Sequence, residues 1–120
     1  MKCARPARDV HFRKDRAVVA IAVGMAESYC RKGAVGHNPP TGGCPHGSDD
    51  RGLWQINSCY HSEVSDHCAF DPTCNARATK HISDRGRDWT PWSAYNNGAF
   101  RQYLQVARHA VHRAWRARGS

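Results

Sequence analysis

The chain has 120 residues, which predicts a single domain large enough to bury a hydrophobic core. Hydrophobic residues make up 40% of it, a share that excludes an intrinsically disordered chain. Lysine and arginine number 18 against 10 aspartates and glutamates, which gives a formal net charge of +8. This charge predicts a polyanionic partner: a nucleic acid, an anionic membrane surface or an anionic cell-wall polymer.

Residues 1–14 are predicted to be a polar leader, because they show no hydrophobic periodicity. They are basic and precede the apolar run Ala17–Ala26, an order that superficially matches a signal peptide. Asp9 and Asp15 interrupt the basic part, however, and no apolar run reaches the roughly 18 residues that span a membrane. We therefore expect no cleaved signal, no transmembrane helix and one domain over residues 15–120.

Six cysteines are many for this length and predict disulfide bonds, which form in oxidising compartments outside the cytoplasm. The count does not select a pairing. Cys68 with Cys74 would close a short loop, and Cys30 with Cys44 would close a glycine-rich one. Zinc is the alternative, because several cysteines lie near histidines. The spacing forms no two CxxC pairs and no HExxH occurs, so we expect no metal site.

The first regular element is predicted to be a buried helix. Asp15 is a suitable N-cap, and the alanine-rich run Ala17–Ala26 is apolar on all sides. The helix is expected to end between Cys30 and Gly33. Glycines and prolines then crowd residues 33–47, which predicts a loop.

Two further helices follow a short apolar element within Ser48–Ser58 that contains Leu53, Trp54 and Ile56. Asp71 and Pro72 match the N-cap and first position of a helix that continues to Ile82. Pro91 begins a shorter helix, which the run Asn96-Asn97-Gly98 ends.

The last segment predicts an amphipathic, basic helix. Apolar residues fall at helical spacing, and arginines and histidines occupy most of the other face. The apolar positions are Phe100, Tyr103, Leu104, Ala107, Val111, Ala114 and Trp115. Such a helix packs on the core, and its basic face can also bind a polyanion. The fold class is therefore mainly α, a helical domain with at most a small β-hairpin.

Glu27 is the first candidate for chemistry. It is one of two glutamates in the chain and ends the most apolar helix. Burial at that point would raise the pKa of its carboxyl, and a raised pKa suits a general acid near neutral pH. The alternative is an ordinary glutamate at a helix end that faces water.

Three blocks in order carry a resemblance to a known family. They are Ala26-Glu27-Ser28, Gly52-Leu53-Trp54-Gln55-Ile56 and Ala94-Tyr95-Asn96-Asn97-Gly98. Together they resemble the lysozyme-like superfamily, most closely the soluble lytic transglycosylase-type domains, with Trp54 where those domains have methionine. The run from Asp88 to Gly98 also resembles phage-borne and actinobacterial members.

The resemblance implies an α+β lysozyme-like fold with a glycan-binding cleft and implies a role for each matching residue. Glu27 would be the catalytic acid, and Ser28 would position it or the substrate. Gln55 and Asn57 would hydrogen-bond the sugar chain, although an asparagine also readily caps local backbone. Tyr95 and Asn96 would lie beside Glu27 in the cleft.

The resemblance leaves open whether one or two carboxylates are catalytic. Transglycosylase-type members use one glutamate, and the acetamido group of the substrate assists. The run Asp50–Ser58 also resembles animal-type lysozymes, in which an aspartate two positions before the glycine is the second catalytic carboxylate; Asp50 matches it. Asp49 is adjacent and offers a substitute. In the structural alternative, Asp50 caps the next element or pairs with Arg51.

We expect a muramidase that cleaves the β-1,4 bond between N-acetylmuramic acid and N-acetylglucosamine in peptidoglycan. It would act outside the cytoplasm, secreted or delivered by a phage, as a monomer without cofactor, specific nucleic acid or membrane insertion. The alternatives are a non-catalytic peptidoglycan- or polyanion-binding module on the same fold and a nucleic-acid binder that uses the basic C-terminal helix.

Overall fold

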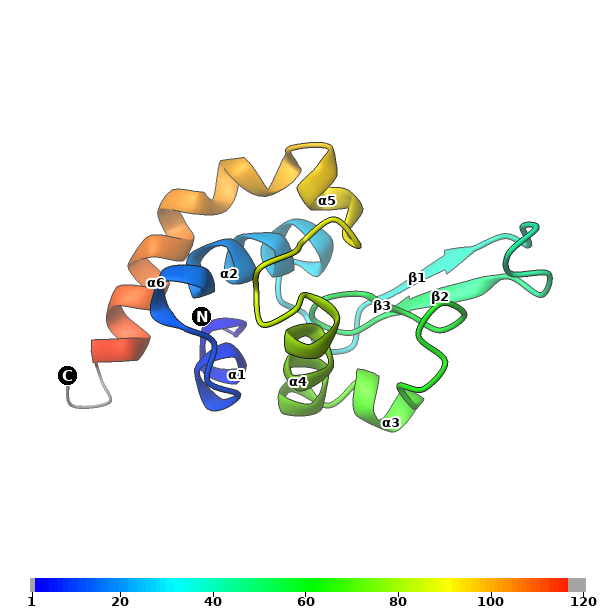
Figure 1. Ribbon diagram of the computed structural model, residues 1–120, viewed down its shortest axis with the longest axis horizontal. Helices are drawn as coiled ribbons and strands as arrows, with labels where there is room; N and C mark the ends of the chain where they lie inside the picture. The colour runs from blue at the N-terminus through cyan, green and yellow to red at the C-terminus, as the bar shows by residue number, and fades with distance from the viewer. Residues whose placement is uncertain (1, 117–120) are drawn as a thin grey trace.

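The computed structural model describes residues 2–116, and the prediction of a mainly α fold is confirmed. A group of helices forms one part of the molecule, and a small antiparallel sheet extends from it (Figure 1). The elements are α1 (Ala4–Asp9), α2 (Lys14–Ser28), β1 (Val35–Asn38), β2 (Ser48–Arg51), β3 (Ile56–Asn57), α3 (Asp66–Ala69), α4 (Pro72–Ile82), α5 (Ser93–Asn96), the 3₁₀ helix η1 (Ala99–Tyr103) and α6 (Leu104–Arg116).

Helix α2 is the central element of the core, as its alanine-rich, apolar sequence predicts. Its residues Ala20 to Met25 are all buried, and it packs against η1 and α6. The N-cap is Arg13, whereas the predicted cap, Asp15, lies inside the first turn. The helix ends earlier than expected because Tyr29 adopts the left-handed conformation (φ 55°), which stops α2 directly after Ser28.

The N-terminal segment differs from the expected polar leader. Residues 4–9 form α1, and Cys3, Ala7 and Phe12 lie in the same core as α2. The small residues of α1 face the core while arginines separate them along the chain, so no long apolar stripe marks the helix. A disulfide between Cys3 and Cys30 ties this segment to the end of α2.

The segment predicted to be a loop contains one strand. Within residues 33–47, β1 pairs antiparallel with β2, and Gly36 lies opposite Asp50. On its other edge β2 pairs with β3, which places Asn57 opposite Asp50 as well. The β1–β2 hairpin projects away from the helices (Figure 1). The sheet therefore sets Asp50 between two neighbouring strands.

The cysteines form three disulfides: Cys3–Cys30, Cys44–Cys59 and Cys68–Cys74. The predicted Cys68–Cys74 bond is confirmed and the Cys30–Cys44 pairing is wrong, because Cys30 lies at the end of α2 against Cys3 while Cys44 lies in the hairpin. With every cysteine oxidised, no thiolate remains as a zinc ligand. The disulfides indicate an oxidising compartment.

Helices α4 and α6 agree with their predictions. The carboxylate of Asp71 caps α4 by accepting a hydrogen bond from the amide of Cys74 at 2.9 Å. The C-terminal segment begins as η1 and continues as α6, with Phe100, Ala107 and Val111 on the buried face. None of the helices built by residues 2–116 is both long and apolar enough to cross a membrane.

Gly52 allows the turn after β2 to pack against α3. It has a φ of +76°, and a Cβ there would collide with the carbonyl oxygen of Ala69 and the amide of Asn75. We expect Gly52→Ala to lower the free energy of unfolding by roughly 2–4 kcal/mol, because backbone strain and overpacking add. Urea unfolding would measure it. Gly42→Ala is the control, since no atom beyond its two chain neighbours lies within 4 Å of its added Cβ. A similar loss of stability there would contradict this explanation.

Candidate active site

A cavity of about 330 Å³ lies where the end of α2, the sheet and the segment before α5 meet. Its wall contains two carboxylates, two side-chain amides and three rings, one each from tyrosine, histidine and tryptophan. Its lining residues are Glu27, Asp50, Gln55, Ile56, Asn57, Tyr60, His61, Ile82, Pro91, Trp92 and Ser93. The cavity therefore brings together four of the residues predicted from sequence: Glu27, Asp50, Gln55 and Asn57.

Glu27 lies at the end of α2 in a half-buried position. Its Oε2 atom accepts a hydrogen bond from the backbone amide of Ala94 at 3.2 Å. Burial raises the pKa of the carboxyl above its ordinary value of 4.5; the bond from Ala94 acts against this rise, and the nearby charge of Asp50 adds to it. A carboxyl with a raised pKa keeps its proton to higher pH, as a general acid requires.

Asp50 is held between two asparagine amides. Asn57 donates to its Oδ1 atom and Asn38 to its Oδ2 atom, both at 3.0 Å. The carboxylate therefore has a fixed orientation in the cavity wall. It neither caps an element nor pairs with Arg51, whose Nη1 atom instead contacts Asp66 Oδ1 at 2.9 Å.

Asp49 does not substitute for Asp50, because successive residues of a strand point to opposite faces. Its Oδ1 atom lies 2.7 Å from Nδ1 of His37, and it does not line the cavity. The neighbouring aspartates of β2 thus have different surroundings, which makes Asp49 a useful control for Asp50.

The amides of Gln55 and Asn57 line the cavity but already have protein partners. Gln55 Nε2 donates to the carbonyl oxygens of Ala34 and Gly52, at 3.1 and 3.0 Å. Asn57 Nδ2 donates to Asp50 and to Ser48 Oγ, and its own Oδ1 accepts from the amides of Cys59 and Tyr60. Asn57 therefore positions Asp50, and the oxygen of Gln55 is the atom that these two side chains leave for a ligand.

Three predicted substrate-binding residues do not line the cavity: Ser28, Tyr95 and Asn96. The hydroxyl of Ser28 is buried and donates to the carbonyl of Leu53 at 2.6 Å, which ties α2 to the turn between β2 and β3. Tyr95 stacks on Phe100 with ring centroids 4.8 Å apart. Asn96 donates to the carbonyl of Thr90 at 2.8 Å. These contacts hold the loops around Glu27.

Two tryptophans fix the walls of the cavity. Trp54 is fully buried and belongs to the core. Its indole nitrogen donates to the carbonyl of Ala20 in α2 at 2.8 Å. Trp92 donates in turn to the carbonyl of Trp54 at 2.7 Å. Helix α2, the turn after β2 and the wall before α5 are thereby joined in one hydrogen-bonded chain.

Three residues of the site were not predicted from the sequence: Asn38, which holds Asp50, and Tyr60 and His61, which line the cavity. Asn38 lies in a segment predicted to be a loop, and only the pairing of β1 with β2 brings it to Asp50. Tyr60 is 68% exposed and offers an aromatic ring at the cavity. The composition of residues 59–61 carries no signal that would single out these side chains before the sheet is known.

A comparison with protein families identifies the family of this chain. The family model described as "Lysozyme like domain" matches residues 4–94, which is more than half of the chain. The chain belongs to the lysozyme-like domain family. No curated protein and no solved structure matches it. The expected resemblance to the lysozyme-like superfamily is thus confirmed, and family membership supports a glycosidase-type function related to peptidoglycan at the cell wall.

The coupling between the two carboxylates of this lysozyme-like domain is testable. Asp50→Asn removes a negative charge that raises the pKa of Glu27, so that pKa is expected to fall. An NMR titration of protein labelled with ¹³C at the glutamate carboxyls would measure it, since only Glu27 and Glu63 give signals. Asp49→Asn is the control and is expected to change the pKa of Glu27 less. An unchanged pKa in Asp50→Asn would contradict the coupling.

Proposed function

We propose that this protein is a peptidoglycan glycosidase that hydrolyses the β-1,4 bond between N-acetylmuramic acid and N-acetylglucosamine. The observation that carries the proposal is the pair Glu27 and Asp50 in one cavity, where burial and the charge of Asp50 raise the pKa of Glu27. Two carboxyl groups in unlike surroundings are what glycoside hydrolysis requires.

Each carboxyl has a distinct role in the proposed reaction. Glu27 in its protonated form donates the proton to the glycosidic oxygen as the bond from that oxygen to the sugar C1 atom breaks. The carboxylate of Asp50 stabilises the positive charge that develops on the sugar ring, either as an ion pair or through a transient bond to C1. A water molecule then attacks C1 and gives its proton to the Glu27 carboxylate, which restores the acid.

The hydrogen bonds around Asp50 favour hydrolysis over the transglycosylase route. In that route a single glutamate acts as acid and base, and the sugar 6-hydroxyl replaces water, which leaves a 1,6-anhydro end. A second carboxylate would have no assigned task there. Asn38 and Asn57 nevertheless orient Asp50 within the cavity, an arrangement that an electrostatic stabiliser needs.

The proposed enzyme acts on glycan strands as a monomer outside the cytoplasm, either secreted or delivered by a phage. The oxidised cysteines and the net charge of +8 support work at an anionic wall.

Incubation with purified peptidoglycan tests the proposal. We expect soluble muropeptide-bearing glycan fragments to appear in proportion to enzyme and time, and to carry new ends at muramic acid. Retained binding without any release of fragments would instead support the non-catalytic module. That module would gain nothing from a partly buried Glu27 beside a second carboxylate, because both groups cost desolvation energy.

A further inference from the structure

A second and larger cavity lies on the side of α1 and α6, and it shares no lining residue with the cavity of Glu27. Its volume is about 1080 Å³. We call it the α1–α6 groove. Six of its lining residues are basic: Lys2, Arg5, Arg8, Lys32, His109 and Arg113. Among the described residues that line it, none is acidic.

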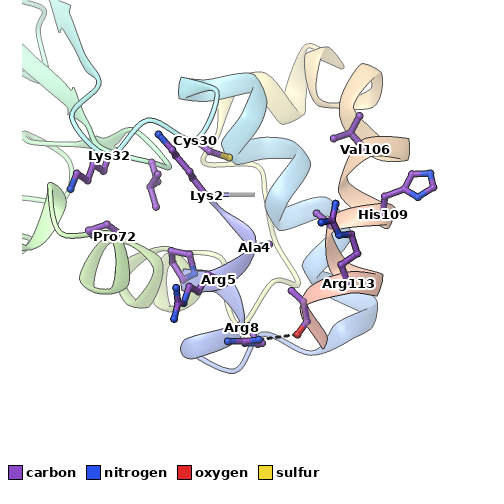
Figure 2. A pocket seen from close by; sticks show the side chains of 14 residues that line it. Lys2, Ala4, Arg5, Arg8, Cys30, Lys32, Pro72, Val106, His109 and Arg113 are labelled. Atoms are coloured by element: carbon purple, nitrogen blue, oxygen red, sulfur yellow. Dashed lines mark hydrogen bonds between the residues drawn. The ribbon is translucent and has the colours of Figure 1, made fainter. Parts of the chain in front are cut away.

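Five of these six residues have no carboxylate partner within residues 2–116, and only Arg8 has one, Asp9 at 3.9 Å. The five are Lys2, Arg5, Lys32, His109 and Arg113. Arg8 is fixed across the base of the groove, because its Nη1 atom donates to the carbonyl of Ala114 in α6 at 3.0 Å. Figure 2 shows Lys2 and Lys32 on one side and Arg113, from α6, across from them. Like charges gathered around a concave surface focus a positive potential into it, which attracts an anion.

The floor between these cations is aliphatic. Ala4, Pro6, Leu53, Ala110 and Ala114 line it, and Val106 is 45% exposed beside them. None of the lining residues that the structure describes is a phenylalanine, tyrosine or tryptophan. The groove therefore combines spaced positive charges with a surface suited to a thin aliphatic chain.

We propose that the α1–α6 groove binds a single flexible phosphodiester strand whose backbone is an aliphatic polyol, such as a poly(glycerol phosphate). The phosphates would contact the lysines and arginines of both sides, and the polyol carbons would lie on the alanine and proline floor. Several cations spread along a groove match repeated charges better than one isolated anion.

Other polyanions fit this groove less well. Proteins that bind single-stranded nucleic acids stack the bases on aromatic side chains, and this lining offers none. A nucleic-acid duplex and a membrane both present broad surfaces that do not enter a concave groove. The proposed site goes beyond glycan cleavage: it would hold the protein on an anionic polymer while the separate cavity of Glu27 faces its own substrate.

Binding of the intact protein to synthetic poly(glycerol phosphate) tests the site. The groove variant combines Lys32→Gln with Arg113→Gln, and its affinity is expected to fall at least about tenfold. The slope of log K against log salt concentration is expected to become less steep by about 1.4, because two phosphate contacts are lost. The control variant, Arg77→Gln with Arg108→Gln, removes the same charge from exposed arginines outside the groove, and its affinity is expected to change less than about twofold.

Equal losses in the groove and control variants would overturn the proposal, since net charge alone would then explain binding. Tighter binding of single-stranded DNA, or of vesicles of anionic phospholipid, than of poly(glycerol phosphate) would also overturn the proposal if that binding depends on Lys32 and Arg113. Cleavage of soluble glycan fragments, which carry no phosphodiester, is expected to be unchanged in both variants. Failure of this site and failure of the proposed glycosidase function are therefore separate results.

Discussion

Glu27→Gln is expected to lower the rate of peptidoglycan cleavage by at least about 100-fold, the usual contribution of a positioned general acid. Glutamine keeps the shape of the side chain, and its oxygen can still accept the hydrogen bond from the Ala94 amide. It cannot give a proton to the glycosidic oxygen. The loss would therefore appear in kcat rather than in substrate binding, and initial rates of fragment release over a range of glycan concentrations would measure it.

Glu63→Gln is the matched control, because Glu63 is the other glutamate of the chain and its side chain is 65% exposed. It is expected to retain most activity. The stability of Glu27→Gln provides a second check. A pKa raised by folding means that ionised Glu27 destabilises the native state as pH rises above 4.5, so the variant should be at least as stable as the wild type at neutral pH. A folded, active Glu27→Gln protein would disprove the assignment of the acid.

Asp50→Asn is expected to reduce cleavage by about 100-fold to 1000-fold, the range seen when a group that stabilises transition-state charge is removed. Asparagine preserves the size of the side chain but removes the negative charge opposite the developing positive charge. It also places an amide among the donors of Asn38 and Asn57, which disturbs the local hydrogen bonds. Crystal or NMR structures of the variant would show whether the cavity keeps its shape.

Asp49→Asn separates the charge effect from changes in the sheet. It alters the neighbouring residue of β2 and the contact with His37, outside the cavity. Activity close to that of the wild type is expected. If Asp50→Asn were as active as Asp49→Asn, Glu27 would act without a second carboxylate and the transglycosylase route would replace the hydrolytic one.

The central features of the site follow from the sequence because they depend on short-range patterns. The apolar residues before Glu27 predict a buried helix, so a carboxyl at its end is expected to be desolvated. Asp71 and Pro72 identify the start of α4 in the same local way. Asp50 is predicted by the resemblance of the run Asp50–Ser58 to animal-type lysozymes, and the positive φ of Gly52 shows why that run requires a glycine.

Features that depend on contacts between distant segments could not be predicted. The register of β1 against β2 places Asn38 beside Asp50, and nothing in the local composition specifies it. Helix α1 is short and rich in arginine, and it is in the core because a disulfide and small side chains hold it against α2. The α1–α6 groove exists only because the fold brings α1 against α6. Ser28, Tyr95 and Asn96 belong to the recognisable motifs, yet they support the site rather than line it.

Mass spectrometry of the reaction products tests the assignment of Glu27 and Asp50 most directly. Purified peptidoglycan would be digested with the intact protein, and the fragments would be compared before and after borohydride reduction. Hydrolysis by two carboxylates predicts muramic acid ends that borohydride reduces. Ends of 1,6-anhydro-muramic acid, which borohydride leaves unchanged, would contradict it and show that Glu27 acts alone as acid and base.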